Sequence, residues 1–241
     1  MRRFSFVAAA AFPFLMALAG CNQLPGVTAE THPPPRPENV VDFHTLYEQN
    51  CQACHGAGGQ NGPAMDLANP EYLALIDDAT LRRIIAKGMP GTQMPAWAQS
   101  AGGMLTDQQI DAIIAGMRHE WAKPNVLAGA TPPPLQQSSG GDPKHGQQVY
   151  QARCAMCHSG PARQQLTSPV YLSLISDEAL RSVIVAGRPD IGQPDWQHNS
   201  ANGAAATPLA GQEVTDIVAY LGSLRNPVTV SAAPIPVPPR R

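Results

Sequence analysis

The chain has 241 residues, of which 43% are hydrophobic and only 5% aromatic, and its 16 basic and 18 acidic side chains give a formal net charge of −2. It therefore lacks the basic field that nucleic-acid-binding proteins use, and that class is excluded. Its 21 glycines and 25 prolines indicate many turns and linkers but fall short of a disordered composition.

The start of the chain has the features of an export signal. Arginines at positions 2 and 3 precede a short apolar stretch at residues 7–19, too short for a membrane-spanning helix. This stretch runs into Leu-Ala-Gly followed by Cys21, which resembles the lipobox of bacterial lipoproteins. The resemblance implies that residues 1–20 are a lipoprotein signal peptide. Lipidated Cys21 would then anchor the exported protein to a bacterial membrane, facing the periplasm or the cell exterior. The alternative is a chance cysteine beside an ordinary cleavage site.

Three stretches rich in proline and polar residues divide the rest of the chain. We expect residues 21–39 to be a lipidated tether, residues 124–143 a linker and residues 227–241 a tail. They leave two segments of similar length, residues 40–123 and 144–226, as candidate domains.

These two segments are copies of one another. Residues 69–97 align without gaps on residues 168–196, with 13 identities in 29 positions. The cysteine pairs upstream are offset by 103 residues rather than 99, so the second copy has lost four residues after its pair. The chain is therefore a tandem repeat of one structural unit.

Helix signals recur in both copies. In the first copy, Asp77 or Asp78 can cap a helix that Gly88 ends, and Thr106 with Gln109 forms a capping-box pattern before a further helix. The apolar positions of this last helix follow helical spacing in both copies: Ile110, Ile113, Ile114 and Met117 in the first, and Val214, Ile217, Val218 and Leu221 in the second. Because no segment shows period-two alternation, we predict an all-α fold of two tandem domains.

The cysteines carry the most specific pattern. Apart from Cys21, they form two C-x-x-C-H motifs: Cys51, Cys54 and His55 in the first copy, and Cys154, Cys157 and His158 in the second. Two intervening residues place both sulfurs within reach of the vinyl groups on one porphyrin edge, and the histidine that follows then falls beneath the iron. We therefore predict two covalently attached haem c groups, with both histidines as iron ligands.

Two other uses of a C-x-x-C pair were weighed. A dithiol redox centre is typical of a βαβ setting, and a zinc site groups its four ligands compactly. This sequence has neither pattern, and haem attachment is preferred.

Each copy resembles a class I cytochrome c domain, and the resemblance covers about 170 of the 241 residues. It implies that Pro63 and Pro161 supply the carbonyls that orient the two histidine rings. It also implies a methionine ligand on the opposite side of the haem, for which Met94, in Met-Pro-Ala-Trp, fits and Met89 is the competitor. Three further methionines, together with Met89 if Met94 is the ligand, are interpreted as packing residues: Met65, Met104 and Met117.

The second copy departs from this pattern, because the residue aligned with Met94 is Gln193 and no methionine follows Met156. Three alternatives stay open: His198 completes a bis-histidine haem, Gln193 is a weak ligand, or the position holds water. An exposed histidine in a loop usually has no role as a ligand. In each case we expect a lower reduction potential for the second haem, because a thioether favours ferrous iron.

The resemblance implies electron transfer, with redox proteins or a membrane respiratory or photosynthetic complex as partners. The rival is a dihaem oxidoreductase, peroxidase-like or thiosulfate-oxidising, that uses the second haem as an open site. No acid–base grouping stands near either motif, and no catalytic residue is predicted. Five basic residues are interpreted as docking charges or as a solvated helix face: Arg82, Arg83, Lys87, Arg181 and Arg188.

Overall fold

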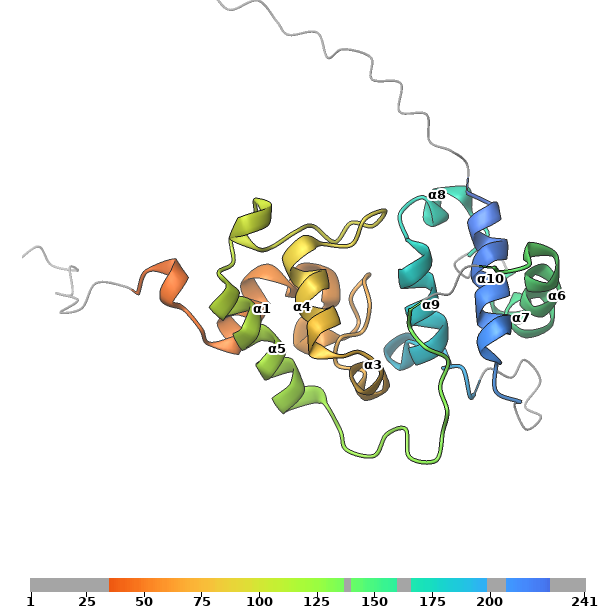
Figure 1. The fold of residues 1–241 in the computed structure, drawn as a ribbon, viewed down its shortest axis with the longest axis horizontal. Helices are drawn as coiled ribbons and strands as arrows, with labels where there is room; N and C mark the ends of the chain where they lie inside the picture. Colours follow the sequence, from red (N-terminus) through yellow and green to blue (C-terminus); the bar gives the residue numbers. More distant parts are fainter. Residues whose placement is uncertain (1–34, 137–139, 160–165, 199–206, 226–241) are drawn as a thin grey trace, which may run out of the picture. The chain divides into compact units, whose positions relative to one another are not determined.

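The structure, a computed structural model, describes residues 35–136, 140–159, 166–198 and 207–225 (Figure 1). The predictions for the signal peptide, Cys21, Pro161 and the tail lie outside the described residues. Residues 1–39 and 40–241 form two compact units, and the described part of the first is the short 3-10 helix η2 (Pro37–Asn39) with its flanking residues. Within the described ranges the chain forms helices and no strand, which confirms the all-α prediction. None of these helices is long and apolar enough to cross a membrane.

The first copy contains five α-helices in the described residues. They are α1 (Phe43–Asn50), α2 (Gln52–His55), α3 (Pro70–Leu75), α4 (Asp78–Lys87) and α5 (Asp107–Trp121), with 3-10 helices η3 (Ala57–Gly59) and η4 (Gln99–Ala101). The predicted signals lie at the ends of α4 and at the start of α5. Asp77, rather than Asp78, caps α4 by accepting from the Thr80 N–H at 2.6 Å. Thr106 and Gln109 form both hydrogen bonds of the capping box at the start of α5.

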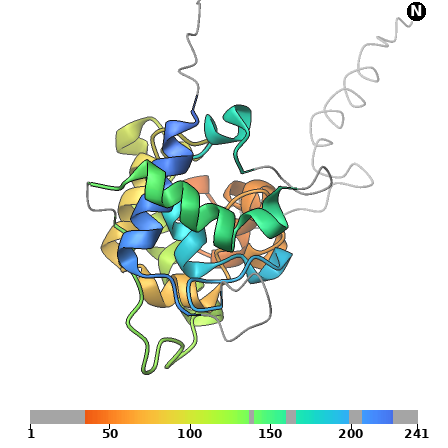
Figure 2. The same cartoon turned by 90° about the vertical axis from the view of Figure 1, so that its right-hand side faces the viewer.

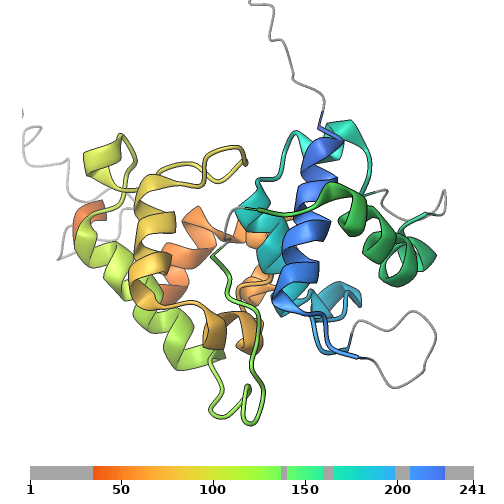
Figure 3. The same ribbon diagram turned by 45° about the vertical axis from the view of Figure 1, so that its right-hand side comes forward.

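The second copy repeats this order. Its helices are α6 (Pro143–Arg153), α7 (Ala155–His158), α8 (Pro169–Leu172), α9 (Asp177–Ala186) and α10 (Gly211–Ser223), with the 3-10 helix η5 (Pro189–Ile191). Helix α6 crosses α10, as α1 crosses α5 in the first copy (Figures 2 and 3). The predicted linker ends at Pro143, where α6 begins. Asp142 caps this helix by accepting a hydrogen bond from the Lys144 N–H.

The predicted apolar stripes form the centres of the two cores. The four stripe positions of α5 and the four of α10 are each at most 6% exposed. Glycines let the helices approach closely: a Cβ on Gly116 of α5 would lie 2.1 Å from the Phe43 ring, and one on Gly146 of α6 would lie 1.9 Å from the Asp216 carbonyl oxygen. Both crossings thus depend on glycine, but on opposite helices of the pair.

Residues 134 and 135 of the linker contact the folded domains. Leu135 contacts both hydrophobic cores, and the Pro134 carbonyl accepts a hydrogen bond from Arg181 Nε at 2.6 Å. The described part of this stretch therefore belongs to the fold.

Candidate functional site

One helical turn gathers the first C-x-x-C-H motif. Cys51 ends α1 and begins α2, and its carbonyl accepts from the N–H groups of Cys54 and His55 at 3.1 and 3.0 Å. Gly56 ends the turn at φ +82°, and a Cβ there would lie 1.8 Å from the Gln60 carbonyl oxygen. Glycine is therefore required where the chain leaves the motif.

The second motif has the same backbone. Cys154 ends α6, and its carbonyl accepts from the N–H groups of Cys157 and His158, both at 3.1 Å. Ser159, at φ −105°, stands where the first copy has Gly56 at φ +82°, so the backbone differs between the copies at this position.

The four cysteines of the motifs are free thiols, with Cys51 and Cys154 partly buried and Cys54 and Cys157 exposed. Burial, followed by the neighbouring Cys54, raises the pKa of Cys51 to about 12, and burial raises that of Cys154 to about 11. A dithiol redox centre depends on a lowered thiol pKa, and burial acts in the opposite direction on Cys51 and Cys154. The described ranges also contain no group of three or more His, Cys, Asp or Glu side chains suited to a metal ion, which leaves the zinc alternative without a site there.

The ring of His55 is oriented by a carbonyl, but not by the one expected. His55 Nδ1 lies 2.8 Å from the carbonyl oxygen of Met65, whereas the resemblance pointed to Pro63. The loop folds back because the Ala64 N–H donates to the Cys54 carbonyl at 2.9 Å, which carries the chain past Pro63 before it reaches the ring. A carbonyl only accepts, so Nδ1 carries the proton and Nε2 keeps its lone pair for a metal. Burial lowers the pKa of His55 and favours this neutral form.

Met94 and Met89 lie in one loop after α4. The Met89 N–H donates to the Met94 carbonyl at 3.1 Å. The Met94 N–H donates to the Thr92 hydroxyl, also at 3.1 Å. Both side chains are partly buried, so burial does not distinguish Met94 from Met89 as the iron ligand of the first domain. The packing prediction is confirmed for Met117, which is 1% exposed, and is wrong for Met104, which is 71% exposed.

In the second copy Gln193 faces the histidine of the motif. His158 Nε2 lies 3.1 Å from Gln193 Oε1. Gln193 is held there by paired backbone hydrogen bonds with Arg188, each of 2.9 Å. His198 is turned to a different partner: its side chain is 74% exposed and its Nδ1 lies 2.8 Å from Asp195 Oδ2. The structure thus brings Gln193, and not His198, to His158.

Two of the five predicted surface charges are buried. Arg181 is 1% exposed and donates to the Thr215 hydroxyl and the Pro134 carbonyl, and Arg188 is 6% exposed and pairs with Asp190. The interpretation of these two as solvated or docking charges is therefore wrong. Their burial follows from tertiary contacts that helical periodicity does not reveal.

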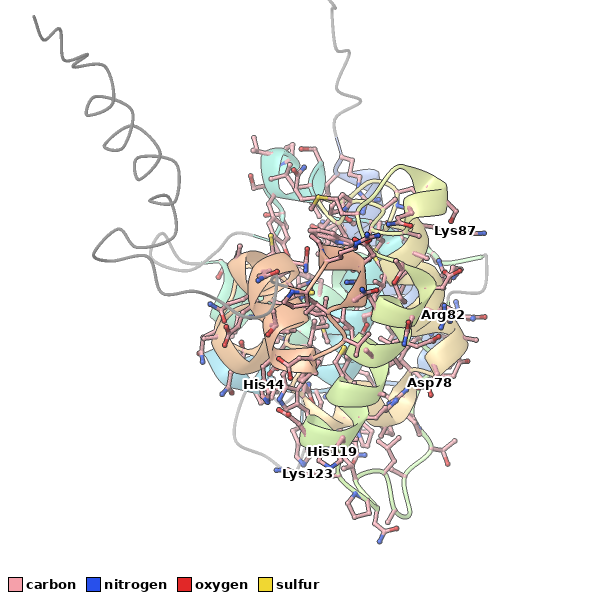
Figure 4. The ribbon with its side chains drawn as sticks, turned by 90° about the vertical axis from the view of Figure 1, so that its left-hand side faces the viewer. His44, Asp78, Arg82, Lys87, His119 and Lys123 are labelled. Carbon is pink, nitrogen blue, oxygen red and sulfur yellow. The ribbon has the colours of Figure 1, made fainter. Side chains whose placement is uncertain are left out.

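The other three basic residues lie nearer the solvent. Figure 4 shows Arg82 and Lys87 on α4. Arg82 forms an ion pair with Asp111 of α5, and Arg83 forms one with Glu178 of α9 at 2.8 Å. Lys87 is exposed, which matches the prediction of a surface charge.

Comparison with known proteins assigns a family to each copy. The family described as cytochrome c oxidase, cbb3-type, subunit III matches residues 38–115, and the cytochrome c family matches residues 143–225. Each match contains one C-x-x-C-H motif.

Two curated relatives share parts of the chain. A dihydro-heme d1 dehydrogenase from Pseudomonas aeruginosa is 36% identical over 96 residues, which cover 36% of this chain and 18% of that protein. A cbb3-type cytochrome c oxidase subunit CcoP from Azospirillum sp. is 29% identical over 140 residues, which cover 52% of this chain and 41% of the relative. The chain thus spans less than half the length of either relative.

Proposed function

Because the chain consists of two cytochrome c-type domains in tandem, we propose that it is a dihaem cytochrome c that transfers electrons in a respiratory chain. Its partners would be redox proteins or a membrane respiratory complex. The likeness to a subunit of a cbb3-type oxidase supports this setting.

The observation that carries the proposal is the pair of matched turns. Each turn consists of the first cysteine and the four helical residues that follow it, and it carries two free thiols and a histidine. These residues suit covalent haem: Cys51, Cys54, Cys154 and Cys157 would form the thioethers, and His55 and His158 would bind the iron. A haem bound in this way supplies an iron that alternates between the ferric and ferrous states.

Met94 in the first domain and Gln193 in the second would be the second protein ligands of the two irons. The contact of 3.1 Å between His158 and Gln193 supports the second assignment over His198, because the His198 ring is held by Asp195. An amide oxygen is a harder donor than a thioether and stabilises ferric iron. The second haem would then have the lower reduction potential.

For the location we propose export and a lipid anchor at Cys21, with the haem domains facing the periplasm or the cell exterior. The arginines and the short apolar stretch before Leu-Ala-Gly-Cys21 support this. Substitution C21S is the test: it should abolish the lipid mass on the N-terminal peptide and move the protein from the membrane to the soluble fraction. A soluble wild-type protein without lipid would contradict the anchor.

A second candidate function is a dihaem oxidoreductase that uses an open site at the second haem. Two observations favour considering it: the absence of methionine at position 193 and a relative that is a dehydrogenase. Carbon monoxide added to the reduced protein separates the two. An unchanged visible spectrum supports the electron carrier, and binding at one haem supports the enzyme.

The proposal as a whole is tested by expression in a host that attaches haem c. The purified protein should gain the mass of two haems and show the visible spectrum of c-type haem. The double substitutions C51A/C54A and C154A/C157A should each remove one haem and leave the other. A colourless wild-type protein of unmodified mass would overturn the proposal.

A further inference from the structure

The two domains meet at the loop that follows the first C-x-x-C-H motif. The Asn61 N–H donates to Asp190 Oδ2 at 2.8 Å, and Arg188 donates to the Gly62 carbonyl at 2.8 Å. Arg188 and Asp190 belong to the same loop of the second domain as Gln193. The loop of the second domain that carries Gln193 is therefore hydrogen-bonded to the loop that supplies the carbonyl to His55.

This contact is buried and charged. Arg188 Nε and one terminal nitrogen hold the Asp190 carboxylate at 2.9 and 2.7 Å, and the two side chains are 7% and 1% exposed. Removing one member of such a pair leaves the other charge buried without compensation. Because the pair is buried, water screens its charges poorly and they act strongly on nearby groups.

A second buried contact fixes the same junction. Asn69 Nδ2 donates to the Ala186 carbonyl at 2.8 Å, and Ala186, from α9 of the second domain, packs in the hydrophobic core of the first domain at 2% exposure. The junction is thus built into the fold and does not rest on one surface contact.

The charged pair is particular to the second copy. At the positions aligned with Arg188 and Asp190 the first copy has Met89 and Gly91, which cannot form an ion pair. The second copy thus differs from the first by two opposite charges at a contact with the loop that follows the first motif.

We propose that Arg188 and Asp190 are positioning residues that the second domain contributes to the haem site of the first, so that the reduction potential of the first haem depends on the docked second domain. This inference rests on the proposed function. Arg188 and Asp190 act on His55 through the loop at residues 61–65 and through their charges.

The electrostatic surroundings support this. Arg188, which pairs with Asp190, binds the Gly62 carbonyl three residues before Met65, whose carbonyl holds the His55 ring. Asp66, 3% exposed, faces the same pair: burial and then Asp190 raise its pKa, and Arg188 lowers it. Positive charge beside the iron favours the ferrous form and negative charge the ferric form.

The two charges therefore predict shifts of opposite sign. R188M, which installs the residue of the first copy, leaves Asp190 uncompensated and should make reduction of the first haem about tenfold less favourable, a fall of about 59 mV for one electron. D190N leaves Arg188 uncompensated and should raise that potential by a similar amount. The double variant R188M/D190N restores neutrality and should return most of the way to the wild type, and R188K should keep most of the wild-type potential.

The experiment is a potentiometric titration of both haems in the full-length protein, followed by visible spectroscopy. R83M is the matched control, because Arg83 and Glu178 form an ion pair between the domains at 2.8 Å with side chains 43% and 37% exposed. It should leave both potentials unchanged. Hydrogen exchange of residues 61–69 reports separately whether each variant keeps the junction closed.

Shifts of the first haem in the same direction for R188M and D190N would overturn the proposal, because a loosened junction alone acts in one direction. Unchanged potentials, or a shift confined to the second haem, would overturn it as well. If R188M fails to retain haem, D190N and R188K decide by the sign of their shifts. Failure of the proposed function is distinguishable, because the wild-type protein itself would then lack both haem spectra.

Discussion

His158 Nε2 and Gln193 Oε1 lie 3.1 Å apart, so the glutamine that replaces methionine in the second domain lies next to the histidine of the motif. Because a thioether favours ferrous iron more than an amide oxygen does, Q193M should give the second haem histidine–methionine ligation and a higher potential. Its reduction potential should rise by on the order of 100 mV, a small part of the range of about 0.8 V that axial ligands span. Potentiometric titration and magnetic resonance of the ferric protein measure this.

H198A is the control for this substitution. His198 is exposed and its ring is held by Asp195, so its loss should leave the ligand spectrum of the second haem unchanged. A changed ferric spectrum in H198A, with none in Q193A, would contradict the assignment of Gln193 and favour the bis-histidine alternative.

The turn after the first motif gives a prediction on stability. Gly56 and Gly58 both have positive φ, at +82° and +66°, but a Cβ on Gly56 would lie 1.8 Å from Gln60 O, whereas one on Gly58 meets nothing within 4 Å. G58A should therefore cost only the left-handed backbone, about 1–2 kcal/mol. G56A should cost clearly more and lower the yield of haem attached at Cys51 and Cys54. Urea unfolding and haem content measure both; equal losses would contradict the steric argument.

Much of the fold could be predicted because its signals are local. Ile113 and Val218 follow helical spacing, and both are at most 1% exposed, while Thr106 and Gln109 lie three residues apart and cap α5 as expected. The six residues of the two C-x-x-C-H motifs were likewise found from spacing alone, and the folded chain sets each trio on one helical turn.

The rest depends on contacts between distant residues. The carbonyl that orients His55 comes from Met65 because the loop folds back onto the motif, and no periodicity marks that position. Sequence alone favours a docking charge or a solvated helix face for Arg188, because arginine side chains are mostly exposed. Its burial follows from a contact with Gly62, 126 residues earlier in the chain, which a single sequence does not reveal.

The pairing of His145 with Asp216 predicts a pH dependence of stability. His145 Nδ1 lies 2.7 Å from Asp216 Oδ2, and this hydrogen bond raises the pKa of His145. A raised folded-state pKa stabilises the fold fully below the unfolded value near 6.5, and the contribution is lost as the pH rises through the folded value. The wild type should therefore exceed H145Q in stability at pH 5.5, and the difference should shrink by pH 9. Urea unfolding at both pH values measures it, and a difference that grows with pH would contradict the pairing.

Asn69 has two roles that substitution can separate. Its Oδ1 accepts from the Glu71 N–H at 2.9 Å and caps α3, while its Nδ2 donates to the Ala186 carbonyl at 2.8 Å. N69S keeps a capping hydroxyl but loses the amide donor, which should cost about 1 kcal/mol because the buried carbonyl loses this partner. N69A loses the cap as well and should cost about 1 kcal/mol more.

The second copy offers the matched control. Ser168 occupies the aligned position before α8, and its side chain makes no capping hydrogen bond. S168A should therefore change the free energy of unfolding by less than about 0.5 kcal/mol. If the losses follow the order N69A, N69S, S168A, the difference between the two copies lies in the amide that reaches Ala186. A loss in S168A as large as that in N69S would instead show that both positions matter only as helix starts.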